Sequence, residues 1–116
     1  MEQRGQNQDA RADPPIPAEW EQWARTLIAF KGANPETRAQ QIEALVRAEG
    51  EDAVVAALRE VATRHPEPRI RRGAIQVLMV MGGPKAFAAI QSTLGDEDPA
   101  VRNQARISLR RQTHER

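Results

Sequence analysis

Apolar residues recur at helical spacing along most of this chain. In residues 68–81 they are Ile70, Ala74, Val77, Leu78 and Met81, at intervals of four, three, one and three. These intervals place the apolar side chains in one stripe, because an α-helix completes a turn in about 3.6 residues. Residues 17–31, 52–63 and 84–94 show the same kind of stripe, with polar positions between the apolar ones. The pattern therefore predicts an all-α protein.

One helical segment occurs three times, with the copies shifted by 33 and then by 31 residues. The copies span residues 35–45, 68–78 and 99–109. Three residue types fall in register in every copy: Pro35, Pro68 and Pro99; Arg38, Arg71 and Arg102; Leu45, Leu78 and Leu109. A fixed period of roughly 30–40 residues is typical of stacked helical arrays, in which each unit buries its apolar face only against its neighbours. The repeat predicts the architecture, and it favours binding over catalysis as the function.

Capping residues and glycines indicate where the helices begin and end. The residue before each repeated proline is Asn34, Glu67 or Asp98. Asn and Asp accept hydrogen bonds from the first-turn N–H groups, and proline is tolerated there because its missing N–H would have no partner. Glu67 is the poorest of the three caps. Gly50 and the pair Gly82-Gly83 predict tight turns, so we expect about six helices with antiparallel neighbours.

The same signals divide the chain into a leader and one repeat domain. Residues 1–15 are polar and end in two prolines, so we expect a disordered leader. We expect one domain over residues 16–116, made of an N-terminal capping helix at 17–31 and repeats at about 33–64, 65–96 and 97–116. The last repeat is incomplete, because it lacks room for a second helix. Trp20 and Trp23 lie on the capping helix, where we expect them to pack in the core or the cap.

Composition argues against several kinds of site. The chain has no cysteine, which excludes disulfides and thiolate metal ligands. His65 and His114 lie 49 residues apart, and no nucleophile or phosphate-binding motif accompanies them. The run Asp96-Glu97-Asp98 is interpreted as a helix cap rather than a metal site. We therefore expect no enzyme, no cofactor and no metal. No segment reaches the roughly 18–20 apolar residues of a membrane span or forms a secretory signal, so we expect a cytoplasmic protein.

Charge is unevenly distributed, although the net charge is only +1. Residues 1–63 contain 7 basic and 11 acidic side chains, and residues 64–116 contain 10 and 5, which gives net charges of −4 and +5. The basic half supports an alternative function, weak nucleic-acid binding through an anion-binding face. Its residues would be Arg102, Arg106, Arg110 and Arg111. The competing interpretation is a solvated outer face combined with structural arginines.

The third copy carries a resemblance to a known family. Residues 96–109 read Asp-Glu-Asp-Pro-Ala-Val-Arg-Asn-Gln-Ala-Arg-Ile-Ser-Leu and follow the pattern Asp-x-x-Pro-x-Val-Arg-x-x-Ala-x-x-x-Leu. This segment resembles HEAT repeats, particularly the short HEAT-like type also seen in phycobilin lyases. The first copy departs from the pattern, with Gln41 where Ala is usual. The resemblance implies a short right-handed α-solenoid of stacked antiparallel helix pairs.

The resemblance also implies a role for the repeated arginines. In the family they form a ladder with acidic residues of neighbouring repeats, which here would involve Arg38, Arg71 and Arg102. A suitable acidic partner is evident only around Asp96 and Asp98.

Three kinds of partner follow from these expectations. The family uses the concave side of its solenoid for protein binding, so the candidate residues lie on the second helices. They are Asp52, Ala56, Arg59, Lys85, Ala89 and Ser92. We therefore expect a non-catalytic adaptor or subunit that binds an unidentified protein. Nucleic acid is the less favoured partner. A third possibility is self-association through the last helix, which lacks the partner helix of a complete repeat.

Overall fold

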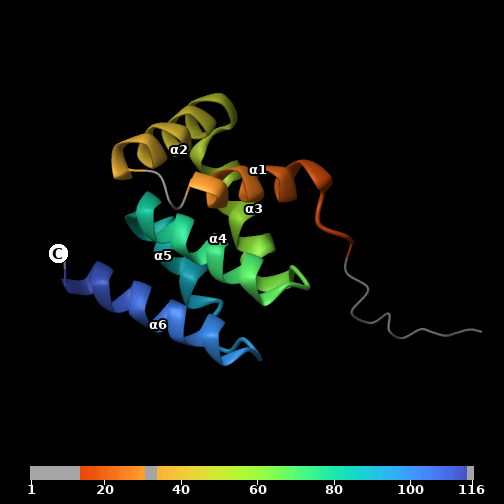
Figure 1. Cartoon of the computed structure of the whole chain (residues 1–116), viewed down its shortest axis with the longest axis vertical. Helices are drawn as coiled ribbons and strands as arrows, with labels where there is room; N and C mark the ends of the chain where they lie inside the picture. Colours follow the sequence, from red (N-terminus) through yellow and green to blue (C-terminus); the bar gives the residue numbers. More distant parts are fainter. Residues whose placement is uncertain (1–13, 31–33, 115–116) are drawn as a thin grey trace, which may run out of the picture.

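The computed structural model describes residues 14–30 and 34–114, with side chains described as far as residue 111. In this part of the chain six α-helices and no strands are present, as the periodicity predicts (Figure 1). The helices are α1 (Ala18–Ala29), α2 (Pro35–Glu49), α3 (Glu51–Arg64), α4 (Pro68–Met81), α5 (Gly83–Gln91) and α6 (Pro99–His114). Most of the predicted leader, residues 1–13, lies outside the described residues.

The predicted caps act as the chemistry of their side chains requires. The Asn34 carboxamide accepts a hydrogen bond from the Thr37 N–H at 2.8 Å, and the Asp98 carboxylate accepts from the Ala100 N–H at 2.8 Å. Glu67 makes no such side-chain bond, so it is the weak cap that the sequence indicates. Gly82 ends α4 with a φ of 70°, a left-handed conformation that glycine adopts without steric cost.

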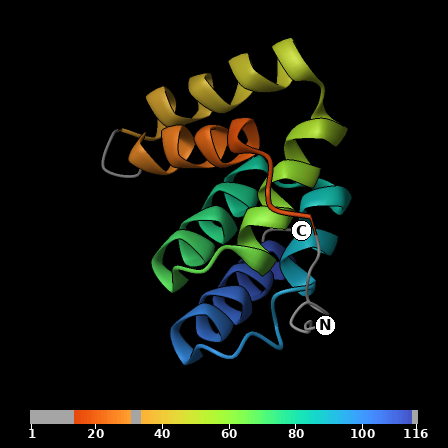
Figure 2. The same cartoon turned by 90° about the vertical axis from the view of Figure 1, so that its right-hand side faces the viewer.

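The helices form two layers, with α3 and α5 on one side and α1, α4 and α6 stacked on the other (Figure 2). Helix α4 lies at the centre and packs against all the other helices. Its residues Ile70, Ala74, Ile75, Val77 and Leu78 are buried, which makes it the main contributor to the core. Together the stacked helices form a short α-solenoid.

Helix α1 occupies the place that the repeat pattern gives to α2. The fourth residues of α1, α4 and α6 are Glu21, Arg71 and Arg102, and three residues later each helix has a fully buried alanine. Those alanines are Ala24, Ala74 and Ala105. Helix α2 lies beyond α1, at the end of the molecule opposite α6 (Figures 1 and 2). The prediction of α1 as the end cap is therefore wrong in its position, since α2 lies outermost.

The close contact between α1 and α4 explains this arrangement. A Cβ atom added to Gly73 of α4 would lie 2.9 Å from the Ile28 side chain of α1, so the missing side chain makes room for that isoleucine. A glycine inside a helix costs about 1 kcal/mol relative to alanine, and this close approach of two helices accounts for it. Helix α2 contributes fewer buried side chains to the packing, because Ile42 is its single buried residue and Gln41 is exposed.

The outer face of α6, the last described helix, carries charged residues. Shifting α4 onto α6 by the repeat spacing places Arg106 at the position of Ile75 and Arg110 at that of Met79. Ile75 is fully buried, whereas both arginines are exposed. A polar outer face is what a terminal helix of a solenoid requires.

One predicted helix is shorter than expected. The stripe over residues 84–94 predicts that Leu94 packs as Val61 does one repeat earlier, but α5 ends at Gln91 and Leu94 is 40% exposed. Val61 is fully buried, whereas the described helices leave Leu94 partly uncovered. The apolar pattern alone does not reveal whether a covering helix exists.

Candidate functional site

The repeated arginines of α4 and α6 bind backbone and carboxylate oxygens of the inter-repeat loops. The Arg71 Nη1 donates to the His65 carbonyl at 2.7 Å, and the Arg102 Nη1 donates to the Asp96 carbonyl, also at 2.7 Å. In addition, Arg71 Nε and Nη2 donate to the two carboxylate oxygens of Asp96 at 2.8 and 2.9 Å. Arg71 and Asp96 thus form a buried, bidentate link between neighbouring repeats.

The environment of this link holds both groups in their charged forms. Burial acts to raise the pKa of Asp96, but the hydrogen bonds from Arg71 and from the Asp98 N–H together bring that pKa below its ordinary value. The hydrogen bond to Asp96 raises the pKa of Arg71. These residues are engaged in holding the repeats together, so they are not available to a ligand.

A histidine takes the position of Asp96 one repeat earlier. His65 lies three residues before Pro68, as Asp96 lies three residues before Pro99, and it is 4% exposed. Its Nε2 lies 2.9 Å from the Glu21 carboxylate of α1, and its Nδ1 accepts from the Glu67 N–H at 3.1 Å. The hydrogen bonds from His65 and Arg25 lower the pKa of Glu21. His65 is therefore structural. Its role was not predicted, because the expected partners of the ladder were acidic residues.

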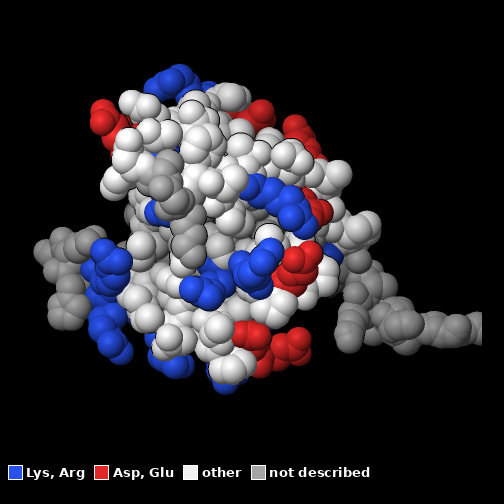
Figure 3. Space-filling view, in the orientation of Figure 1, with Lys and Arg blue, Asp and Glu red and all other residues white. Residues whose placement is uncertain are grey.

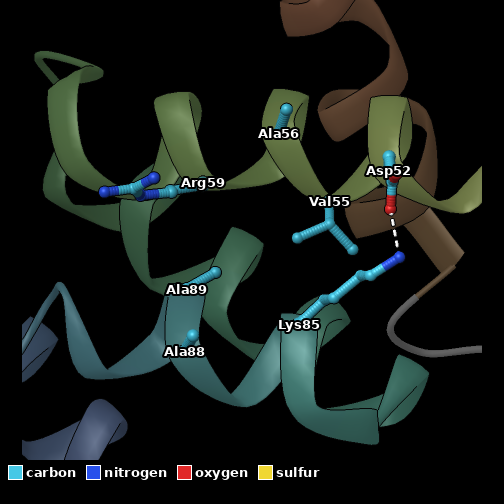
Figure 4. Close-up of a pocket in the computed structure, with 7 residues that line it drawn as sticks. All are labelled: Asp52, Val55, Ala56, Arg59, Lys85, Ala88 and Ala89. Carbon is cyan, nitrogen blue, oxygen red and sulfur yellow. Dashed lines mark hydrogen bonds and ion pairs between the residues drawn. The ribbon is translucent and has the colours of Figure 1, made fainter.

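Most of the predicted protein-binding residues line a groove between α3 and α5, which has a volume of about 390 Å³ (Figure 4). Its lining residues are Asp52, Val55, Ala56, Arg59, Lys85, Ala88 and Ala89. Five of the six predicted protein-binding residues are among them. Ser92 does not line the groove. Its hydroxyl donates to the Ala89 carbonyl at 2.6 Å. Val55 and Ala88 were missed because the prediction selected a single line of positions along each helix.

Charged groups stand at the two ends of this groove, above an alanine-rich floor. Lys85 Nζ and the Asp52 carboxylate form an ion pair across it, which links α5 to α3 (Figure 4). The hydrogen bond to Asp52 raises the pKa of Lys85. Arg59 extends along α3 away from that pair (Figure 4). The side chains of Asp52 and Lys85 are more than half exposed, so this pair contributes little to stability and can exchange partners.

The predicted anion-binding arginines do not form one equivalent set. Arg102 is half-buried, and its Nη1 also donates to the Glu97 carbonyl at 3.2 Å, which gives it a structural role. Arg106, Arg110 and Arg111 are exposed on α6. Figure 3 shows basic side chains along the lower edge, where α6 lies, with acidic ones beside them.

The two tryptophans lie at the surface rather than inside the core. Both are half-buried. Trp20 borders a groove formed with Pro14, Pro15, Pro17, Glu60 and Arg64. Trp23 borders a second groove, between α1 and α2. Of the two expected places, the core or the cap, the core is excluded for both, because the buried face of α1 consists of Ala24 and Leu27.

Other kinds of site find no support in the described residues. No three His, Cys, Asp or Glu side chains between residues 14 and 111 come together as metal ligands. None of the helices that the structure describes is long and apolar enough to cross a membrane. The side chain of His114 lies outside the described residues.

Comparison with known proteins gives one match. The family model described as HEAT repeats matches residues 24–110, which covers α2 to α5, the second half of α1 and most of α6. No curated protein and no solved structure matches the chain.

Proposed function

The chain belongs to the HEAT-repeat family, and we propose that it is a non-catalytic adaptor or subunit that binds another protein through the groove between α3 and α5. HEAT repeats generally mediate protein–protein interaction. The single observation that carries the choice of surface is the gathering of Ala56, Ala88 and Ala89 between charged groups at both ends of the groove. Small side chains allow the backbone of a partner helix or strand to approach closely.

The charged ends would orient the bound segment. Arg59 offers a guanidinium at one end, and the Asp52–Lys85 pair offers both signs of charge at the other. A partner carboxylate could accept from Arg59, while a partner charge near Lys85 could replace Asp52 as its ion-pair partner. This arrangement favours an apolar segment that carries at least one acidic residue.

We place this function in the cytoplasm and assign it no cofactor. Catalysis is not part of the proposal, and the lining of the groove contains no serine, threonine, cysteine or histidine. Nucleic-acid binding is less well supported, since Arg71 and Arg102 are engaged in the structure and only the exposed arginines would remain for phosphates. No Tyr or Phe lies among those arginines of α6 to stack on bases.

The test is a capture experiment with a variant that fills the groove. Ala88→Arg places a long side chain at an exposed position of the groove, and Ala29→Arg places the same side chain at an exposed position of α1. The wild type and both variants are used to capture partners from native lysate, with and without nuclease. A protein retained by the wild type and Ala29→Arg, but lost by Ala88→Arg, supports the proposal. A protein retained equally by all three overturns the choice of groove.

The nuclease arm separates the two kinds of partner. Recovery that disappears after nuclease treatment in every variant would replace the protein-binding proposal with nucleic-acid binding. Recovery that survives nuclease, and still depends on Ala88, identifies a direct protein partner.

A further inference from the structure

We propose that copies of this chain associate head to tail, with the outer face of α6 of one copy seated in a groove between α2 and α4 of the next. These surfaces lie outside the α3–α5 groove, so the proposal is independent of the function inferred above. It concerns α2 and α6, which lie at opposite ends of the described array of helices.

The outer face of α6 is a single apolar residue surrounded by cations. Ile107 is 41% exposed, one of two large apolar side chains with such exposure among the described residues. Arg106 precedes it, and Arg110 and Arg111 follow at helical spacings of three and four, so they share its side of the helix. The equivalents of Arg106 and Arg110 in α4 are the apolar Ile75 and Met79. The cations therefore prevent a simple continuation of the core at this end.

Helix α2, at the opposite end of the array from α6, forms one wall of an apolar groove with an acidic rim, and the end of α4 forms another. The groove between α2, the start of α3 and the end of α4 has a volume of about 380 Å³. Its apolar residues are Ala39, Ile42, Val46, Val80 and Met81. Glu43 and Glu51 stand on its rim, and both are exposed. Glu43 has only a loose ion pair with Arg47, at 3.8 Å, so its carboxylate can accept a stronger partner.

The two surfaces complement each other in both charge and polarity. An exposed isoleucine faces an apolar floor, and three arginines face two glutamates. The same separation is visible in the whole sequence, where residues 1–63 have a net charge of −4 and residues 64–116 of +5. Opposite charges favour contact between the basic face of α6 and the acidic groove. They disfavour contact between two basic faces or between two acidic grooves.

The location of these surfaces determines the kind of assembly. Helix α2 and helix α6 lie at opposite ends of the molecule, so one copy cannot satisfy its own groove (Figures 1 and 2). A contact between two different surfaces is heterologous, and it produces open chains of copies unless the rotation closes a ring. The contact is small and partly ionic, so it is weak and depends on ionic strength.

The test is the mass of the chain in solution, measured by sedimentation velocity up to ~300 µM, a range that detects weak contacts. At about 50 mM salt the mean mass should rise with protein concentration, and at about 500 mM it should return towards that of the monomer. A monomer at every concentration in low salt overturns the proposal.

Charge reversal identifies the surfaces. Arg106→Glu/Arg110→Glu and Glu43→Arg/Glu51→Arg should each weaken association at least tenfold, about 1.4 kcal/mol. An equimolar mixture of the two variants should associate again, because each reversed surface then meets a complementary one. Circular dichroism verifies that the variants remain folded. The single variant Glu43→Arg replaces the double one if the change at Glu51, in the first turn of α3, impairs folding.

Two outcomes would contradict the arrangement. Association that is lost with the arginine variant but unchanged with the glutamate variant would indicate that α6 binds a different surface. A mixture that stays monomeric would show that the two surfaces do not face each other.

Discussion

Helices α2 and α4 carry the same repeated proline, arginine and leucine, yet α4 lies at the centre of the array while α2 lies outside it. Seven residues of α4 are buried, compared with one residue of α2. The place next to α4 is taken by α1, whose Ile28 fits against Gly73. The comparison shows that a repeat motif determines the local shape of a helix, while complementarity with a neighbour determines where the helix packs.

The polar links on the two sides of α4 also differ from each other. On the α4 side, the side chains of Asp96 and Arg71 are each 7% exposed. On the α1 side, the loop group is His65 and the helix group is Glu21, whose side chain is 35% exposed. A polar link is thus present at both junctions. The loop supplies the carboxylate in one link, from Asp96, whereas a helix supplies it in the other, from Glu21 of α1. Helix α2 takes part in neither link.

The largest expected difference concerns the leucine that α2 and α4 share. Leu78→Ala should lower the free energy of unfolding by about 3 kcal/mol, because Leu78 is fully buried and its loss leaves a cavity. Leu45→Ala, at the same repeat position of α2, should cost only about 1 kcal/mol, since Leu45 is half-buried. Urea denaturation of both variants measures the two losses. Equal losses would show that α2 belongs to the core as fully as α4 does.

Much of this fold follows from the sequence. The six helices and the caps at Asn34 and Asp98 follow from periodicity and capping chemistry, because those are local properties of the backbone. Most of the α3–α5 groove also follows, since residues at helical spacing on adjacent second helices must face the same side. The close approach at Gly73 was predictable from a glycine inside a helix.

The exchange of places between α1 and α2 could not be predicted in the same way. Both helices have an apolar stripe, and the choice between them depends on the fit of Ile28 to a space in another helix. The exposure of Leu94 likewise depends on what lies beyond it, which the stripe does not encode. The role of His65 depends on Glu21, 44 residues away, a pairing that no local pattern reveals.

A smaller effect should appear when the buried link on the α4 side is titrated. The pKa of Asp96 is lower in the folded chain than its ordinary value, so the unfolded chain binds a proton more readily. The stability from ionised Asp96 is therefore present above the ordinary carboxyl pKa of about 4 and is lost as the pH falls through the lower, folded pKa. Denaturation midpoints from pH 6 down to about pH 3 should show this loss.

The matched control for this titration is an exposed carboxylate in another ion pair. Asp96→Asn should reduce the loss of stability in acid and also lower the stability at neutral pH. Asp52→Asn should leave the acid profile nearly unchanged, because the Asp52–Lys85 pair is solvated. An acid profile that Asp96→Asn does not alter would assign the acid sensitivity to other carboxylates, with Glu21 as the first candidate because its pKa is also lowered.

The smallest expected effect tests whether α2 opens independently of the rest. Gln41→Ala restores the alanine that the repeat pattern usually has, at an exposed position of α2. Ala has the highest helix propensity, so the change should stabilise α2 by a few tenths of a kcal/mol. If α2 opens locally while α4 opens only with the whole chain, this gain should slow amide exchange in α2 and leave exchange in α4 almost unchanged. Hydrogen exchange measured residue by residue distinguishes the two cases, and equal slowing in both helices would show that they unfold as one unit despite their unequal burial.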